Sequence, residues 1–119
     1  MSQQHEPRED HAARLRQLEV EVSEALERLN LAADGDERSD GHHHPAEAAT
    51  DADRRERELR EQLRWREREE RIRVARAALE AGTYGICADC GSAIPEGRLR
   101  ALPDAIRCVS CQTAFDRRR

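Results

Sequence analysis

Two cysteine pairs constrain the fold of this chain more than any other feature. Cys87 and Cys90 enclose two residues, Cys108 and Cys111 enclose two more, and seventeen residues separate the pairs. A two-residue spacer lets a tight turn aim both sulfurs of a pair at one metal ion, and two such turns complete a tetrahedral zinc shell. Gly91 directly follows the second cysteine and suits the positive φ that such a turn often needs. The spacing predicts one zinc ion with a closed shell, which is typical of structural rather than catalytic zinc.

Two disulfides are the alternative use of four cysteines. The first fifteen residues are polar and charged and lack the apolar core of a signal peptide. We therefore expect a cytoplasmic protein, in which thiols stay reduced. No apolar run approaches the length of about eighteen residues that a membrane span needs, so we expect no membrane partner.

The composition limits the size of any core. Charged residues make up 39% of the chain, only four residues are Met, Trp, Tyr or Phe, and 18 of the 44 hydrophobic residues are alanine. The apolar residues must therefore be buried along a narrow seam, around a metal or against a partner. The charge is also uneven, because residues 1–53 carry a net −9 and residues 54–119 a net +5. Opposite charges favour antiparallel pairing of the two halves.

Apolar spacing predicts two long helices. In the first, from about residue 7 to 33, apolar residues alternate at intervals of three and four: Leu15, Leu18, Val22, Ala25, Leu29 and Ala32. Gly35 suits its C-terminal cap. Residues 34–49 contain glycine, proline and three histidines and are predicted to be a loop. Thr50 and Asp53 fit a capping box for a second helix that ends near Ala81, with a poorer stripe: Leu59, Leu63, Trp65, Ile72, Ala75 and Leu79.

These elements predict an all-α-dominated fold. Residues 1–83 should form a long antiparallel helical hairpin, a coiled coil with a tip loop at about 34–49. Residues 84–119 should form a small four-cysteine zinc-finger base that ends in a short helix over 112–119. We expect a monomer.

The segments around the cysteines resemble a known family. Gly82-Thr83-Tyr84-Gly85-Ile86 precedes the first pair, Gly91-Ser92-Ala93-Ile94-Pro95 follows it, and Arg98-Leu99 and Ala101-Leu102-Pro103 precede the second pair. Over residues 79–115 this pattern is similar to the zinc finger of DksA/TraR transcription factors. The resemblance implies a zinc base that carries a coiled-coil hairpin, and bacterial RNA polymerase as the partner. The base would dock at the rim of the polymerase secondary channel and the hairpin would insert.

The resemblance also directs attention to the predicted tip. Tip aspartates carry the effect of family members on polymerase, and Asp51 and Asp53 are the acids at this place in the chain. Their order, Asp51-Ala52-Asp53-Arg54-Arg55, differs from the family pattern of two aspartates three residues apart followed by an alanine. Helix capping is the alternative role for both acids.

Other residues are candidates for contacts with a partner or a metal ion. Arg98 and Arg107 are candidates for contact with an acidic partner. The histidines at 42–44 are either a solvated turn or ligands for a divalent ion. Trp65 is either an anchor of the seam or an exposed interface residue.

Alternative functions remain open. No nucleophile, acid–base or phosphate-binding pattern is present once four thiolates bind zinc, so we expect no enzymatic activity. One alternative is a nucleic-acid-binding zinc module, although the acidic first half argues against direct DNA binding. A Gre-like transcript-cleavage cofactor, whose tip acids would hold magnesium in the polymerase active site, is the other.

Overall fold

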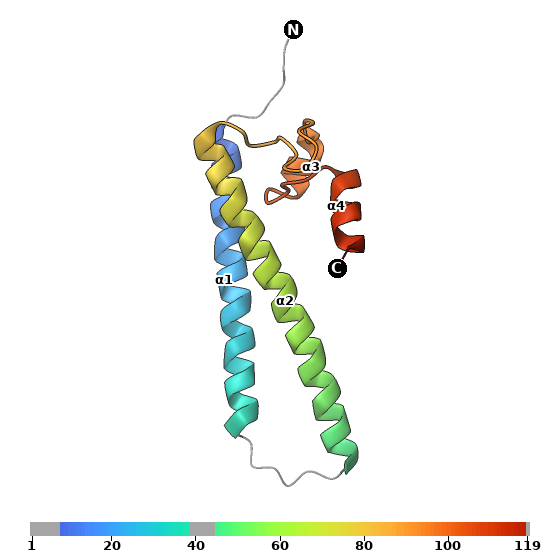
Figure 1. Cartoon of the computed structure of the whole chain (residues 1–119). Coiled ribbons are helices and arrows are strands. Elements are labelled where there is room, and N and C mark those ends of the chain that lie inside the picture. The colour runs from blue at the N-terminus through green and yellow to red at the C-terminus, as the bar shows by residue number, and fades with distance from the viewer. Residues whose placement is uncertain (1–7, 39–44, 119) are drawn as a thin grey trace. The chain divides into compact units, whose positions relative to one another are not determined.

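The computed structural model describes residues 8–38 and 45–118, and the side chains of 9–31 and 49–118. It contains four helices: α1 (Arg8–Arg38), α2 (Pro45–Ala81), α3 (Glu96–Ala101) and α4 (Val109–Arg117) (Figure 1). The described residues form no strand beyond one isolated antiparallel bridge between Ile86 and Ala93. The predicted all-α-dominated class is confirmed. Within the described helices, none is both long and apolar enough to cross a membrane.

The long helices extend further than predicted. α1 continues through Gly35 to Arg38, and α2 begins at Pro45, so the loop predicted over 34–49 is wrong at both ends. A single glycine inside a helix costs only about 1 kcal/mol, and proline is well tolerated in a first turn because its missing N–H has no partner there. The histidines at 42–44 lie outside the described residues.

The predicted capping box is also wrong. Because α2 begins at Pro45, Thr50 and Asp53 lie inside the helix rather than at its first residue. Good helix formers between Pro45 and Thr50 explain the earlier start. At the other end of the chain, α4 begins at Val109, three residues before the predicted start, and α3 was not predicted.

The chain divides into two compact units. The finger unit contains the described residues up to Glu19 and from Glu69 onward, and the arm unit contains Val20–Arg68. In each unit a segment of α1 pairs with a segment of α2. Arg76 Nη1 lies 2.7 Å from Glu19 Oε2 in the finger unit, and Gln62 Nε2 donates to Asn30 Oδ1 over 3.1 Å in the arm unit. The later residue of α1 thus pairs with the earlier residue of α2, so the two helices run antiparallel.

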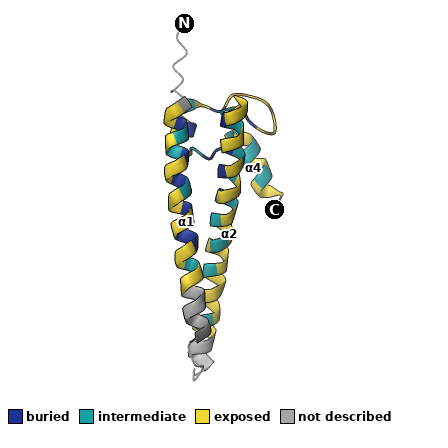
Figure 2. Ribbon diagram, turned by 90° about the vertical axis from the view of Figure 1, so that its left-hand side faces the viewer, coloured by how far each residue is buried: buried dark blue, intermediate teal, exposed yellow. Residues whose placement is uncertain are grey.

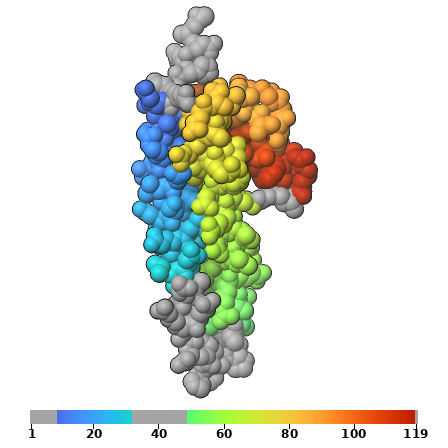
Figure 3. All heavy atoms as spheres, turned by 60° about the vertical axis from the view of Figure 1, so that its left-hand side comes forward, coloured from blue at the N-terminus to red at the C-terminus, as the bar shows by residue number. Residues whose placement is uncertain are grey.

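The seam is apolar in the finger unit. Five of its residues are buried: Leu15, Leu18, Ile72, Ala75 and Leu79 (Figure 2). The finger lies beside the C-terminal part of α2 (Figure 3), where Arg71 of α2 contacts Asp104 of the finger.

The seam is poorer in the arm unit. On α1, Val22, Ala25 and Leu26 are buried, but on α2 Leu59 and Leu63 are 54% and 55% exposed. The predicted stripe is therefore wrong for these two leucines. The partly buried positions of α2 in this unit include Asp51, Glu58 and Trp65, which are seven residues apart, and this is the spacing of a coiled-coil seam. Leu59 lies one residue beyond that line, and its side chain is more than half exposed.

Candidate metal centre

Two short turns present the four cysteines of the finger unit. In the first turn, Gly91 N–H donates to Cys87 C=O over 3.0 Å, and Cys87 N–H donates to Ser92 C=O over 2.8 Å. Gly91 has φ +76, which confirms the predicted positive φ. In the second, Cys108 is the N-cap of α4 and Cys111 lies in its first turn.

The sulfur positions fit a zinc ion. All four Sγ atoms lie within 4.8 Å of one another, and Cys90 Sγ is 3.9 Å from Cys108 Sγ. Zn–S bonds of about 2.3 Å at tetrahedral angles place neighbouring sulfurs about 3.8 Å apart. All four cysteines are free thiols, so the structure contains neither of the two disulfides considered as the alternative. Four sulfur donors match a closed structural site.

Without metal, the surroundings of Cys87, Cys90 and Cys111 shift the pKa values of these three thiols. Hydrogen bonds from the backbone of Cys108 and Cys90 lower the pKa of Cys87 to about 6. The hydroxyl and backbone of Ser92 lower the pKa of Cys90. The sulfurs of Cys108 and Cys87 raise the pKa of Cys111 to about 12, since a thiol between thiolates keeps its proton. A divalent cation removes this conflict, because it stabilises all four thiolates together.

An apolar cluster supports the first cysteine. Cys87 is only 2% exposed and belongs to a buried cluster with Ile94, Leu99 and Ala105. The sulfur ligands and the small core of the finger are therefore built from the same residues. This arrangement suits a module in which metal binding and folding occur together.

The two predicted arginines have partners inside the finger. Arg98 Nε donates to the Arg107 carbonyl over 3.2 Å, and Arg107 Nε lies 2.8 Å from Asp89 Oδ2. The Arg107 guanidinium also stacks over the Phe115 ring at 4.0 Å, which connects the first cysteine turn to α4. Both side chains therefore contribute to the shape of the finger, whatever they contact outside it.

Buried polar groups that the sequence analysis missed connect the finger to the helices. Asp104 is 1% exposed, and its Oδ2 accepts a hydrogen bond from Arg71 Nε over 3.2 Å. Tyr84 donates its hydroxyl proton to the Pro103 carbonyl over 2.8 Å. The Leu-Pro turn at 102–103 was recognised as a motif, but its role in positioning Asp104 against α2 has no signal in the sequence.

The structure does not bring the remaining candidates to the metal centre. Asp51 and Asp53 belong to the arm unit, where Asp51 Oδ1 lies 3.4 Å from Arg54 Nη2 and Asp53 is exposed. Trp65, also in the arm unit, is partly buried, and its indole N–H points to Glu61 Oε1 at 3.5 Å. It is neither a fully buried anchor nor a fully exposed residue.

Comparisons with known proteins agree on the finger. The profile of the prokaryotic dksA/traR C4-type zinc finger matches residues 82–117. An uncharacterized 8.5 kDa protein of Escherichia phage 186 is 42% identical over 59 residues, which cover 50% of this chain and 75% of that protein. The uncharacterized protein YteA of Bacillus subtilis is 44% identical over 62 residues, or 52% of this chain and 26% of YteA. The chain thus spans only about a quarter of the length of that relative.

A solved structure shares the fold. Transcription factor DksA2 from Pseudomonas aeruginosa superposes with a TM-score of 0.74 at 23% identity, over 93% of this chain and 84% of that chain. The likeness therefore includes the helical hairpin as well as the finger. Together with the clustered cysteines, the C4 finger supports one structural zinc ion in this chain.

Proposed function

Because the chain belongs to the DksA/TraR family of C4-type zinc-finger proteins, we propose that it is a cytoplasmic transcription regulator that binds bacterial RNA polymerase at the secondary channel. In this proposal the zinc base docks at the channel rim, the coiled-coil tip inserts, and the protein acts as a monomer without enzymatic activity. The supporting observation is the fold likeness to a transcription factor over 93% of the chain, which continues beyond the finger into both long helices.

We assign the metal ligands to Cys87, Cys90, Cys108 and Cys111. The assignment is supported by the mutual distances of their sulfur atoms, all within 4.8 Å. The zinc ion would hold the two cysteine turns together and so fix α3 and α4 in the base. With four protein ligands it would have no open position for a water nucleophile, so its role would be structural.

We assign the effect on transcription to Asp51 and Asp53. Both lie on α2 in the arm unit, outside the helix terminus, so capping does not explain them. Residues two apart on a helix do not face each other. Their carboxylates are therefore poorly arranged to grip one magnesium ion, which favours a regulator over the Gre-like cleavage cofactor. Separate contacts with two basic or metal-bound groups of the partner fit this spacing better.

The direct test is binding to purified core polymerase with no DNA present. We expect a complex that survives nuclease treatment and is displaced by a Gre factor. If the protein ignores polymerase but shifts naked DNA with a steep salt dependence, the nucleic-acid-module alternative replaces this proposal.

Two sets of variants distinguish residues that bind polymerase from residues that change transcription. Asp51→Asn with Asp53→Asn should leave polymerase affinity within about tenfold and reduce the effect on transcription. Arg98→Ala or Arg107→Ala should lower affinity for polymerase. Zinc content must be measured for both arginine variants, because these side chains also bond inside the finger. Unchanged transcription with the double asparagine variant would remove Asp51 and Asp53 from the mechanism.

A further inference from the structure

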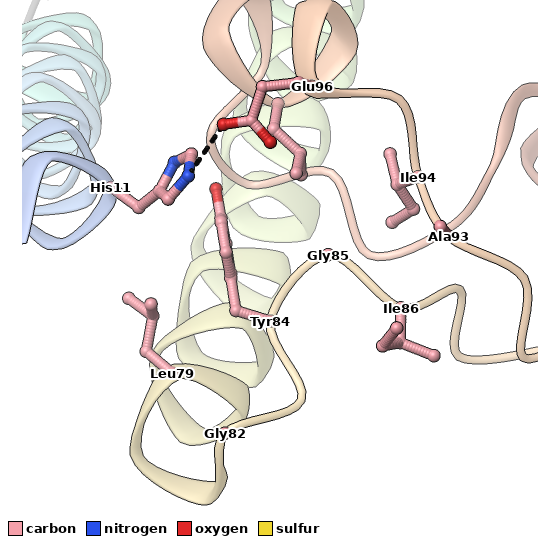
Figure 4. A pocket seen from close by; sticks show the side chains of 10 residues that line it. His11, Leu79, Gly82, Tyr84, Gly85, Ile86, Ala93, Ile94 and Glu96 are labelled. Atoms are coloured by element: carbon pink, nitrogen blue, oxygen red, sulfur yellow. Dashed lines mark ion pairs between the residues drawn. The ribbon is translucent and has the colours of Figure 1, made fainter. Parts of the chain in front are cut away.

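Two hollows in the described part of the chain differ in whether their charged groups are already paired. One lies in the finger unit, bordered by α1, the start of α3 and the segment 84–86 before the first cysteine (Figure 4). There His11 Nε2 is 3.0 Å from Glu96 Oε1, and His11 Nδ1 is 2.9 Å from Arg14 Nη2. A carboxylate, an imidazole and a guanidinium thus bond to one another, so the charges at this hollow are balanced within the protein.

The other hollow lies on α2 in the arm unit and is lined by arginines. Its volume is about 430 Å³, and six residues border it: Arg54, Arg57, Glu58, Arg60, Glu61 and Arg64. Four of these side chains are positive and two are negative, so the lining has a net positive charge. Such a surface is complementary to an anionic partner.

Carboxylates of the same helix neutralise only some of these arginines. Arg54 and Arg60 each pair with a glutamate of α2, at 3.8 Å and 3.4 Å. Arg57 and Arg64, by contrast, form no ion pair with any of the described residues. Both of these side chains are exposed, so their guanidinium groups are accessible to a partner.

The arginines form a row that is unfavourable for an isolated helix. Arg57 and Arg60 are three residues apart, and Arg60 and Arg64 are four apart. Residues at these intervals are neighbours on one helix face, and like charges at such positions destabilise a helix. The helix therefore contains a repulsion that an anionic partner would relieve.

A row of leucines beside the arginine row distinguishes between kinds of anionic partner. Leu59 and Leu63 are four residues apart, are 54% and 55% exposed, and directly precede Arg60 and Arg64 in the sequence. A nucleic-acid backbone offers phosphate oxygens to arginines but no apolar side chains to cover two leucines. A protein helix can present carboxylates in one row and apolar side chains in the next, at the same intervals of three and four residues. The two rows together therefore favour a protein partner.

We propose that this face of α2, with its leucine row and its arginine row, binds an acidic amphipathic helix of a partner protein. Carboxylates of that helix would pair with Arg57 and Arg64, and its apolar side chains would cover Leu59 and Leu63. Arginine suits such a contact because its planar guanidinium can bind a carboxylate through two parallel hydrogen bonds. The proposal goes beyond the proposed polymerase function. Its test contains no polymerase, so either can fail alone.

The test uses two synthetic helical peptides of about twenty residues that differ only in charge. The acidic peptide carries leucines four residues apart with a glutamate beside each, and the neutral peptide carries glutamine in place of glutamate. NMR titration of the zinc-loaded full chain with the acidic peptide should give saturable shifts at Leu59 and Leu63. The neutral peptide should bind at least about fivefold more weakly. Absence of saturable shifts with the acidic peptide would overturn the proposal, as would tighter binding of a single-stranded RNA oligonucleotide or of anionic lipid vesicles.

Two pairs of substitutions with the same change in net charge locate the contact. Arg57→Gln with Arg64→Gln should weaken binding of the acidic peptide by at least about fivefold. Arg16→Gln with Arg28→Gln removes two exposed arginines of α1 and should change the affinity by less than about twofold. Equal effects of the two pairs would overturn the proposal, because the net charge of the protein would then explain the binding.

The leucine row is tested separately. Leu59→Ala with Leu63→Ala should weaken the acidic peptide by at least about fivefold, because alanine removes most of the apolar contact. Leu31→Ala, at an exposed leucine of α1, is the control and should leave the affinity unchanged. Circular dichroism and zinc content check the fold of each variant, and if the double alanine variant fails to fold, the arginine pairs still decide. Unchanged affinity in a folded double alanine variant would overturn the proposal.

Discussion

The finger unit and the arm unit share the same two helices but are stabilised in different ways. In the finger unit Leu15 and Ile72 are 0% and 2% exposed, and the cysteine turns and α3 add a second apolar cluster. In the arm unit Leu31, Leu59 and Leu63 are more than half exposed. Two isolated helices can bury only the stripe between them, so leucines outside that stripe remain in water. A third packed element is what gives the finger unit a core.

The charged groups of the finger unit and the arm unit also differ in how far they are buried. The finger unit buries Asp104 and His11, and each contacts a residue far away in the sequence. Ion pairs along α2 in the arm unit, such as Arg60–Glu56 and Arg54–Glu58, are local i,i+4 pairs with exposed arginines. Exposed pairs of this kind contribute about 0 to 1 kcal/mol. Buried polar contacts therefore fix the tertiary structure of one unit, while the other depends on helix formation.

The largest effect should come from removal of zinc. Cys87→Ser, or chelation of the metal, should release the finger, because structural zinc contributes about 10 to 16 kcal/mol of apparent binding free energy. Circular dichroism should show that much of the helix signal of the arm unit survives. Metal analysis and NMR spectra measure the two outcomes, with Ser110→Ala as the control between two cysteines. An intact finger spectrum without metal would contradict the prediction.

A fall in pH should also release the zinc ion and unfold the finger. Protons compete with zinc for the thiolates, so the zinc-bound pKa values lie below those of the unfolded chain. The stabilisation is therefore complete at neutral pH and is lost as the pH falls. Zinc release followed with a chromogenic chelator should coincide with loss of the finger signals and leave those of the arm unit unchanged. Simultaneous loss of both sets would mean that the two units unfold together.

A matched pair of leucines on α1 compares the two units directly. Leu15→Ala should cost about 2 to 5 kcal/mol of unfolding free energy, because it leaves a cavity in a packed core. Leu31→Ala should change the free energy by no more than about 0.5 kcal/mol, since this side chain is 65% exposed. Urea denaturation of the zinc-loaded protein measures both. Similar costs would indicate that a further contact covers Leu31 in solution.

Two aspartates test the buried and the exposed ion pairs. Asp104→Asn removes the charge opposite Arg71 in a buried place and should cost about 1 to 3 kcal/mol. Asp51→Asn removes a charge opposite Arg54, whose side chain is 45% exposed, and should cost less than about 1 kcal/mol. The same denaturation experiment ranks them, and a reversed order would refute the comparison.

The smallest effect should come from the polar seam of the arm unit. An exposed hydrogen bond between the side chains of Gln62 and Asn30 joins α2 to α1 in this unit. A double-mutant cycle of Gln62→Ala and Asn30→Ala should give a coupling free energy of about 0.5 kcal/mol or less. A coupling above about 1.5 kcal/mol would show that this contact, and not helix formation, holds the arms together.

Local patterns in the sequence determined much of this protein. The two cysteine spacings predicted one zinc centre, the glycine after Cys90 predicted a positive φ, and the seven-residue intervals predicted Leu15, Val22, Ile72 and Leu79 as seam residues. Each of these depends on residues that are close in the chain and on the fixed geometry of a turn or a helix. A feature can be predicted from the sequence when it depends on interactions between residues that are close together in the chain.

Only the tertiary structure decided the rest. The C-terminal end of α1 and the N-terminal end of α2 could not be predicted, because one glycine or proline is outweighed by its helical neighbours. The spacing of Leu59 and Leu63 is compatible with a helix face that is buried or with one that is exposed. Only the position of α1 shows that these two leucines are exposed to water. The contacts of His11 with Glu96 and of Arg71 with Asp104 join residues 85 and 33 positions apart. Nothing local encodes such pairs, because they form only when the finger folds back on the helices.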